Sequence, residues 1–346
     1  MRLFLIGILG VGFGLAAQAP QAAVRIGAPS TVGRGMQPRN AVGTAVLGFV
    51  TGPGPSELSA ILGVFGAARI GEAVAVPETV TRLYLSTGQR YALVEQNSSG
   101  PLAVWRLDET ALAGDTATNS GFATIAGALP HPDMVAFSPR GDSVALYARV
   151  SGQIQVISGM PNQPSIRKTT PPASAGPITM IAISDDASVL VIRDSMGAVR
   201  ISTGGDWQPF YGAYSPSAWA FVPKTHNLVI SDSQENALFL VEQAGSKNTR
   251  MVLAENCSAD QVGVTGDGEA LVALDSRRSI VWTVDLKRWI ANITTAAEAL
   301  NSLAMLRGGN TFVASSSNAD ATLLKVSEGG TLQISVIHAT REVSGH

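Results

Sequence analysis

The sequence has few of the residues from which disulfide frameworks and metal sites are built. Of its 346 residues, one is a cysteine, Cys257, and four are histidines. A single cysteine excludes an intramolecular disulfide framework and any zinc site with several cysteine ligands. Four histidines, one of them the last residue, argue against a histidine-built metal site. We therefore predict neither a metal nor a cofactor.

Charge is also scarce. Charged residues make up 14% of the chain, and 24 Lys and Arg against 26 Asp and Glu give a net charge of −2. A nucleic-acid-binding protein normally carries a basic excess, so we expect no nucleic-acid partner. Hydrophobic residues, at 45%, are plentiful enough to form a core and exclude disorder of the whole chain.

The N-terminus has the layout of a secretory signal peptide. Arg2 precedes an uncharged apolar run over Leu3–Ala17, and small residues follow as far as residue 23. The run is shorter than the roughly 20 residues that a membrane-spanning helix needs. We expect residues 1–23 to be removed and the rest to be periplasmic or extracellular, with no membrane span. The alternative is an uncleaved anchor. Pro20 disfavours cleavage directly after Ala19, so the cleavage position between Ala17 and Val24 stays open.

A repeat dominates the remaining chain. Six segments share an apolar strand, a tight polar turn and a second apolar strand. The first strands are Val80–Leu85, Met134–Phe137, Ile178–Ile183, Ala218–Val222, Gln261–Val264 and Ser302–Leu306. The second strands end at Gln96, Arg149, Asp194, Asp232, Asp275 and Ser316, in steps of 53, 45, 38, 43 and 41 residues. This period is typical of a β-propeller blade with four short strands.

The length predicts one further blade. We expect an all-β fold, a single propeller over residues 24–346 with seven four-stranded blades; six or eight blades are the alternatives. Residues 24–79 should form the first blade, with strands at Ala45–Val50, Ile61–Phe65 and Ala73–Val76. That blade lacks a fourth strand in the pattern. We predict that Leu332–Ile337 or Val24–Ile26 supplies it, so that strands from both termini close the ring.

Two segments carry a family resemblance. Phe137–Asp142 resembles the F-S-P-D-G turn of TolB-like and WD-like propeller repeats, and Ser188–Ile201 is similar to YVTN-type and lactonase-type repeats. The resemblance covers about residues 80–337 and rests on structural turns. Those families include lactone hydrolases, cell-envelope complex components and surface proteins of unknown role. The resemblance therefore implies a propeller without specifying its chemistry.

The topology sorts the polar residues into candidate sites. Loops between second and third strands should share one face with the connections between blades. Three carboxylates recur in these loops, at Asp194, Asp232 and Asp275, and with Asn301 they are the candidate binding residues. The alternative is that each Asp closes its own turn.

A second set consists of acid–base residues in the connections between blades. Glu78, His131, Asp133 and Asp260 are weak candidates for catalysis, because a histidine with carboxylates is suited to acid–base hydrolysis. No nucleophile elbow, phosphate-binding glycine loop or zinc-protease motif occurs in the sequence.

We therefore predict a secreted or envelope-associated module that binds a protein, a small molecule or a glycan, and acts as a single chain. The alternatives are a lactonase-like hydrolase and a TolB-like subunit of an envelope complex.

Overall fold

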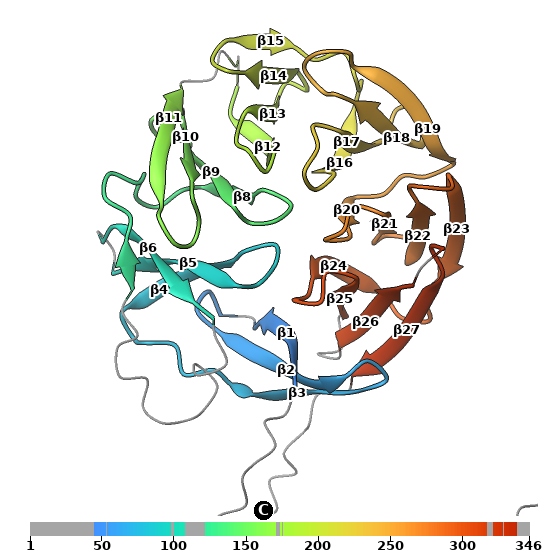
Figure 1. Ribbon diagram of the computed structural model, residues 1–346, viewed down its shortest axis with the longest axis horizontal. Helices are drawn as coiled ribbons and strands as arrows, with labels where there is room; N and C mark the ends of the chain where they lie inside the picture. The colour runs from blue at the N-terminus through green and yellow to red at the C-terminus, as the bar shows by residue number, and fades with distance from the viewer. Residues whose placement is uncertain are drawn as a thin grey trace, which may run out of the picture. The chain divides into compact units, whose positions relative to one another are not determined.

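The computed structural model describes residues 45–52, 54–97, 100–107, 122–170, 174, 176–316, 321–327 and 329–337. They belong to one compact unit, residues 43–346, and every regular element among them is a strand (Figure 1). No helix long and apolar enough to cross a membrane occurs in this described part of the chain. The signal peptide predicted for residues 1–23 lies outside the described residues.

The strands form seven antiparallel sheets in chain order. The first contains β1 (Val46–Thr51), β2 (Leu58–Val64) and β3 (Ala67–Ala73). The second contains β4 (Val80–Leu85), β5 (Tyr91–Gln96), β6 (Leu102–Arg106) and β7 (Ala123–Thr124). The third contains β8 (Met134–Phe137), β9 (Ser143–Ala148), β10 (Gln153–Ser158) and β11 (Ser165–Thr170). The fourth contains β12 (Ile178–Ile183), β13 (Val189–Asp194), β14 (Val199–Thr203) and β15 (Trp207–Pro209).

The remaining three sheets complete the ring. The fifth contains β16 (Pro216–Phe221), β17 (Leu228–Asp232), β18 (Ala237–Glu242) and β19 (Thr249–Glu255). The sixth contains β20 (Gln261–Val264), β21 (Ala270–Asp275), β22 (Ile280–Asp285) and β23 (Ile290–Thr295). The seventh contains β24 (Leu300–Met305), β25 (Thr311–Ser316), β26 (Ala321–Val326) and β27 (Leu332–Ile337). The fold is therefore the predicted all-β propeller of seven blades. Six blades have the predicted four strands, and the first has three among the described residues.

A hydroxyl residue shapes the turn between the first two strands of several blades. The side-chain oxygens of Ser138, Ser184 and Thr265 each accept a hydrogen bond from the backbone N–H five residues later, at 3.1, 3.0 and 3.0 Å. Gly141 and Gly268, two positions before the second strand, have φ of 70° and 79°, which glycine adopts without strain. Local turn chemistry therefore sets the first hairpin of a blade.

The core lies between neighbouring blades. Second strands are the most buried, as in β17, where all five residues are buried. Apolar side chains of adjacent blades interlock there; Trp282 of the sixth blade packs with Val229 and Leu238 of the fifth. Because each blade face needs a neighbour to bury it, the repeats are stable only as a ring.

The first blade differs from the prediction. β1 and β2 lie close to the strands predicted at Ala45–Val50 and Ile61–Phe65, but β3 ends at Ala73, where the third predicted strand begins, and Val74–Val76 form no strand. The reason is a tight turn at Gly66, whose φ of 84° lets β3 follow β2 directly. The Pro/Gly segment after Thr51 separates β1 from β2, as expected.

The predicted exchange of strands between the termini is also wrong for Leu332–Ile337. This segment is β27 and pairs along its whole length with β26 of its own blade. Every sheet in the described part of the chain consists of consecutive strands. The other candidate, Val24–Ile26, lies outside the described residues.

The inner edge of β1 is covered by turns of two other blades. The side-chain amide of Gln89 accepts from the Phe49 N–H at 2.7 Å and donates to the Phe49 carbonyl at 2.9 Å. The Arg307 N–H donates to the Leu47 carbonyl at 3.2 Å. Gln89 is buried. Its side-chain amide therefore satisfies the Phe49 backbone groups that a neighbouring strand would otherwise bond. β1 therefore begins on the propeller face that carries the turns between the first and second strands. It runs in the same direction as the second strands of the other blades.

Packing completes the closure. Ile61 and Ile70 of the first blade lie in one apolar cluster with Val313, Leu323 and Ile337 of the last. Side-chain packing and the capped edge of β1 therefore join the first and last blades.

Candidate functional site

Asp232 is fully buried at the end of β17 and organises two loops. Its Oδ2 accepts from the N–H groups of Tyr214 and Ser215 at 2.6 and 2.9 Å. Its Oδ1 accepts from those of Gln234 and Glu235 at 2.9 and 3.2 Å. One carboxylate thus ties the loop after the second strand to the connection that precedes the blade.

The other two loop aspartates also bind backbone. Oδ1 of Asp194 accepts from Met196 and Ala198 N–H, both at 3.0 Å. Asp275 accepts the Arg278 N–H at 3.1 Å and pairs with the Arg278 guanidinium at 2.9 Å. Both aspartates are buried, and no group of three or more possible metal ligands occurs among the described residues. The three carboxylates therefore have turn-closing contacts.

Two candidate catalytic residues, Asp133 and Asp260, form hydrogen bonds within their own blades. Asp133 donates its N–H to the Tyr147 carbonyl and accepts the Arg149 N–H on Oδ2 at 2.6 Å. Asp260 repeats this in the sixth blade: its side chain accepts the Ser276 N–H at 3.2 Å and the Ser276 hydroxyl. These carboxylates hold the end of the second strand against the preceding connection.

Two further predicted residues, Glu78 and Asn301, are exposed. Glu78 lies at the surface in the connection before β4. Asn301 lies at the β-bulge of β24, and its carbonyl accepts from the Gln261 side chain at 2.7 Å. Among the described residues, no hydrogen bond or ion pair joins any two of Glu78, His131, Asp133 and Asp260. The structure therefore does not link the four candidates directly.

One of them, His131, belongs to a different cluster. Its Nδ1 lies 2.8 Å from Oε2 of Glu95, which is buried at the end of β5. The Tyr84 hydroxyl donates to Oε1 of Glu95 at 2.7 Å, and Arg82 Nη1 lies 3.7 Å from the same oxygen. We call Arg82, Tyr84, Glu95 and His131 the interblade cluster. It lies between the second and third blades, with Glu95 near the end of β5 and His131 in the connection before β8, which is the face of the interblade connections.

The electrostatics of the cluster keep Tyr84 protonated. Burial, opposed by a hydrogen bond from Arg82 and helped by Glu95, raises the pKa of Tyr84 to about 12. The hydrogen bond with Tyr84 and the charge of Glu95 raise the pKa of Arg82. The Tyr84 hydroxyl thus accepts from Arg82 Nη1 at 3.2 Å while donating to Glu95. The Glu95 carboxyl thus contacts Tyr84 through one oxygen and His131 through the other.

The two ends of the cluster reach solvent. The side chains of Arg82 and His131 are 51% and 41% exposed, whereas that of Glu95 is 5% exposed. With Nδ1 bound to Glu95, the Nε2 atom of His131 has no hydrogen-bonding partner in the described part of the chain. His131 also has a φ of 48°, in the left-handed region that few residues other than glycine adopt.

Sequence reasoning missed Glu95 and Tyr84. Glu95 is the one charged residue in the apolar strand Tyr91–Gln96, and a buried acid there requires partners. That requirement is a usable signal. The partners themselves, one 11 and one 36 residues away, give no local pattern.

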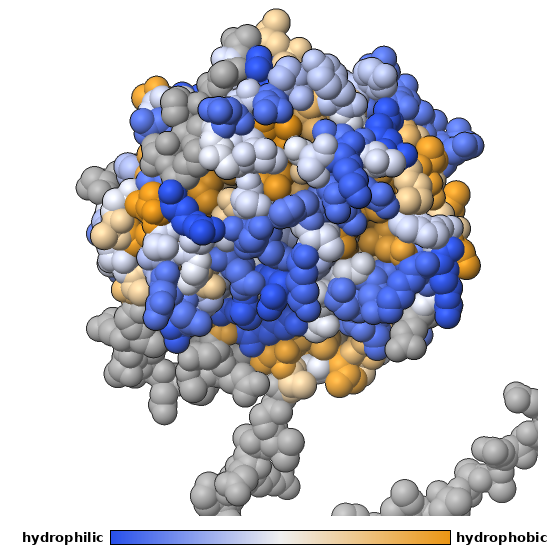
Figure 2. All heavy atoms as spheres, turned by 45° about the horizontal axis from the view of Figure 1, so that its top comes forward, coloured by the Kyte–Doolittle hydropathy of each residue, from blue (hydrophilic) through white to orange (hydrophobic). Residues whose placement is uncertain are grey.

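The propeller channel holds a mainly apolar cavity of about 290 Å³. It is lined by the inner strands of six blades, with Leu85, Ile181, Trp219, Val262 and Leu303 among the lining residues. No residue of β1, β2 or β3 lines it. Outside it, hydrophilic residues cover much of the centre of the face in Figure 2, with hydrophobic residues nearer the rim.

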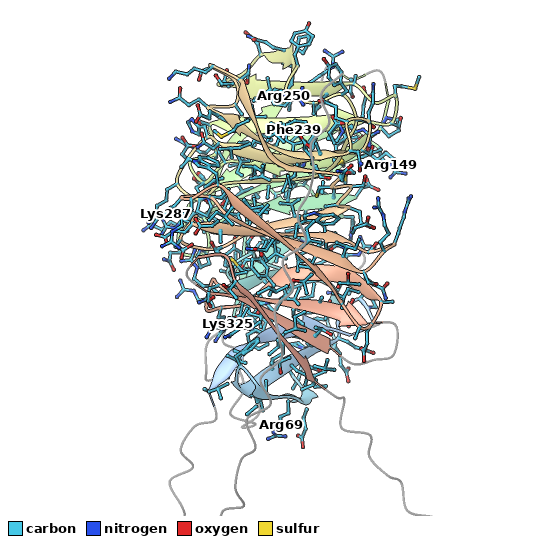
Figure 3. The ribbon with its side chains drawn as sticks, turned by 90° about the vertical axis from the view of Figure 1, so that its right-hand side faces the viewer. Arg69, Arg149, Phe239, Arg250, Lys287 and Lys325 are labelled. Atoms are coloured by element: carbon cyan, nitrogen blue, oxygen red, sulfur yellow. The ribbon has the colours of Figure 1, made fainter. Side chains whose placement is uncertain are left out.

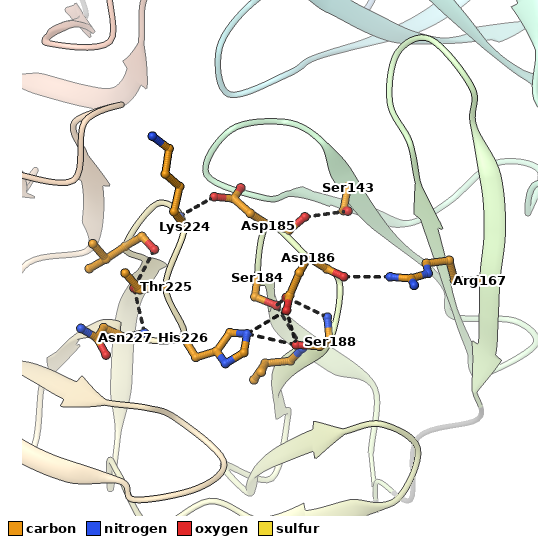
Figure 4. Close-up of polar contacts among 12 residues, drawn as sticks. Ser143, Arg167, Ser184, Asp185, Asp186, Ser188, Lys224, Thr225, His226 and Asn227 are labelled. Carbon is orange, nitrogen blue, oxygen red and sulfur yellow. Dashed lines mark hydrogen bonds and ion pairs between the residues drawn. The ribbon is translucent and has the colours of Figure 1, made fainter.

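A second histidine cluster lies on the turn face (Figure 4). Nε2 of His226 lies 3.0 Å from Oδ2 of Asp186 and 3.1 Å from Oγ of Ser188. Ser188 Oγ in turn donates to Asp186 at 2.8 Å. Despite partial burial, hydrogen bonds from Ser184, Ser188 and His226 hold the pKa of Asp186 well below its usual value. A catalytic triad places serine and carboxylate on different ring nitrogens, so this arrangement closes a turn and is not a triad.

Comparison with known proteins shows the fold only. No family model and no curated protein matches the chain. The structure is similar to that of a functionally unknown protein from Desulfotomaculum acetoxidans, at 13% identity and a TM-score of 0.53, over 85% of this chain and 100% of the other. Hsv2 from Kluyvelomyces marxianus gives 10% identity and a TM-score of 0.47, over 72% and 77%. No specific family follows from these similarities.

Proposed function

We propose that the protein is an exported binding module that holds a hydroxyl-rich ligand, such as a glycan, at the interblade cluster. The observation that carries the proposal is the buried Glu95, which fixes His131 and Tyr84 while Arg82 and His131 remain exposed. Polar side chains that are held in place by a rigid scaffold favour ligand binding, because little order is lost when the ligand binds.

The charges favour a neutral ligand over an ionic one. The Arg82 guanidinium is influenced by the carboxylates of both Glu95 and Asp133, so the cluster has no excess positive charge. Arg82 offers further N–H donors, and Nε2 of His131 donates or accepts according to its tautomer. The vicinal hydroxyl groups of a sugar both donate and accept hydrogen bonds, so they match the donors and acceptors of Arg82 and His131.

A thermal-shift screen with neutral and acidic oligosaccharides at millimolar concentration tests the proposal. A ligand that binds the folded state raises the melting temperature by mass action. We expect a shift with a neutral sugar that is lost in Arg82→Gln and kept in the control Arg106→Gln, whose guanidinium contacts Asn162 elsewhere. No shift with any sugar, or a shift unchanged in Arg82→Gln, would refute the proposal.

A hydrolase is the second candidate, favoured by the Glu95–His131 pair. A carboxylate on Nδ1 orients the ring and leaves Nε2 to act as a general base on water attacking a lactone or ester. Hydrolysis that His131→Gln abolishes, and that Glu95→Gln reduces strongly, would support this role. Absence of hydrolysis across a panel of lactones and esters would refute the hydrolase and leave the binding role as the remaining candidate. The TolB-like envelope subunit stays a prediction from the repeat resemblance.

Export is part of the proposal and rests on the sequence of residues 1–23. Expression in a Gram-negative host should give a product shortened by about 17–23 residues outside the cytoplasm. A full-length product in the membrane fraction would indicate the uncleaved anchor.

A further inference from the structure

The cavity in the propeller channel has a lining that repeats around the ring. The last residue of the first strand lines it in every blade from the second to the seventh, and all six are apolar: Leu85, Phe137, Ile183, Phe221, Val264 and Met305. Ser86, Thr87 and Pro139 from the turns that follow these strands also line it. The cavity therefore lies at the end of the channel that carries these turns. Figure 3 shows the ring from its edge, with Lys287 on this face and Arg149 on the opposite one.

Small residues in the lining leave this space open. The position before the last residue of the first strand is alanine or glycine in five of the six blades. Four of these residues line the cavity: Ala182, Ala220, Gly263 and Ala304. Ala304 is exposed, although β24 is the innermost strand of its blade. Protein interiors are normally close-packed, and residues around an apolar space lack contacts on one side. A ligand that fills the space supplies those contacts.

The lining favours an uncharged ligand. None of the described residues that line the cavity is charged. The Thr87 hydroxyl donates to the Ser138 carbonyl at 3.0 Å, and the Gln89 amide already bonds to Phe49. A charge placed in such surroundings loses its hydration without gaining a partner. Water is held poorly where few polar groups are free, so an apolar ligand gains affinity by displacing it.

One polar group in the lining has no partner. The Trp219 side chain is half-buried, and its indole N–H makes no hydrogen bond in the described part of the chain. An indole nitrogen only donates. A ligand with one hydrogen-bond acceptor therefore matches this wall of the cavity better than a pure hydrocarbon does.

The volume sets the size of the ligand. An apolar cavity of about 150 Å³ holds one benzene molecule. The channel cavity has about 290 Å³. Two fused aromatic rings, or an aliphatic molecule of similar size, therefore match it.

We propose that the channel cavity binds a small neutral molecule with an apolar body the size of two fused rings and one acceptor that receives the Trp219 N–H. Burial of the apolar body in a concave, pre-formed site supplies the affinity. None of the four residues of the interblade cluster lines the cavity, so this site is independent of the proposed glycan site.

Isothermal titration calorimetry with 2-naphthol, which is neutral at pH 7 and carries one oxygen, tests the proposal. We expect saturable binding of one molecule per chain. Ala304→Phe places a ring in the cavity from an exposed position and should weaken binding about tenfold or more. Ala304→Asp should weaken it similarly, because it places an unpaired charge in the lining.

The controls Ala291→Phe and Ala291→Asp make the same changes on the outer strand β23, where Ala291 is also exposed, and should bind 2-naphthol like the parent. Circular dichroism identifies the variants that fold. A parent that does not bind, folded Ala304 variants with unchanged affinity, or controls that lose binding would each overturn the proposal.

Trp219→Phe tests the role of the indole N–H, because it keeps an aromatic wall and removes the donor. The loss of one hydrogen bond corresponds to about fivefold in affinity. In this variant the affinity for 2-naphthol should fall about fivefold relative to that for naphthalene, which has no oxygen. An unchanged ratio of the two affinities would overturn the assignment of Trp219 as the donor to the ligand.

Discussion

The two buried aspartates Asp232 and Asp194 should lose very different amounts of stability on the same substitution. Both carboxylates are buried at the end of a second strand, and Asp→Asn changes neither their size nor their shape. Asp232 accepts two N–H groups on each oxygen, whereas Asp194 accepts two on Oδ1 alone. Oδ2 of Asp194 is buried without a hydrogen-bond partner in the described part of the chain.

The magnitude follows from the hydrogen-bond count. An amide nitrogen cannot accept, so Asp232→Asn turns an NH₂ group toward two N–H donors in either orientation. Hydrogen bonds to a charged group contribute about 1.5–3 kcal/mol each, so we expect the free energy of unfolding to fall by about 3–6 kcal/mol. In Asp194→Asn the NH₂ group takes the unpartnered position and the amide oxygen keeps both donors. We expect a change within about 1 kcal/mol.

Urea unfolding followed by circular dichroism and by tryptophan fluorescence measures both changes. A similar denaturant slope with a lower midpoint would identify a pure loss of stability in Asp232→Asn. Equal effects of the two substitutions, or a larger loss in Asp194→Asn, would refute the contact-based reasoning.

Further predictions concern packing, reactivity and pH. Gly263→Ala puts a Cβ 2.6 Å from the buried Phe312 ring and should cost about 1–3 kcal/mol of stability, measured by urea unfolding, whereas Gly308→Ala, with one atom at 3.7 Å, should cost little steric energy. Burial raises the pKa of Cys257 to about 11, so the thiol should be unreactive toward alkylating reagents at pH 8 until urea unfolds the chain; rapid labelling of the folded protein would contradict this. Burial raises the pKa of Tyr84 from 10.0 to about 12, so its contribution to stability is complete below pH 10 and lost as the pH rises toward 12. Melting temperatures should show a smaller loss over that range in Tyr84→Phe than in the parent. Millimolar calcium should leave the melting temperature unchanged, because the loop aspartates already bind backbone N–H groups.

Blades with local turn signals were predictable, and the first blade was not. Turns such as Ser138–Asp142 position their own hairpins, so a serine, a glycine and two apolar runs suffice to recognise them. In the first blade, the Gln89 side chain bonds to Phe49 of β1 from 40 residues away in the sequence. No sequence pattern near Phe49 predicts this contact. Leu332–Ile337 was one of two candidates for the missing strand of the first blade, because apolar alternation identifies a strand and does not identify its neighbour.

The candidate site shows the same limit. The sequence drew attention to His131, because its connection leads into an inner strand. It placed Asp133 and Asp260 beside it in one candidate set, although each binds the end of a second strand in its own blade. Residue type and loop position can nominate an acid or a base, but the partner that fixes it comes from pairing across blades.

The capped edge of β1 has a consequence for how the ring opens. A sheet shared between the first and last blades would have to lose a whole ladder of hydrogen bonds before the two could separate. Here the connection depends on packing, on the Arg307 N–H bound to the Leu47 carbonyl and on the Arg307 guanidinium over the Phe49 ring. Slow opening motions should therefore begin at this junction, and native-state hydrogen exchange should reach the amides of β1 by a partial opening well below the free energy of global unfolding. The amides of β17 and β21, each between two paired strands far from the junction, should exchange only when the whole ring unfolds.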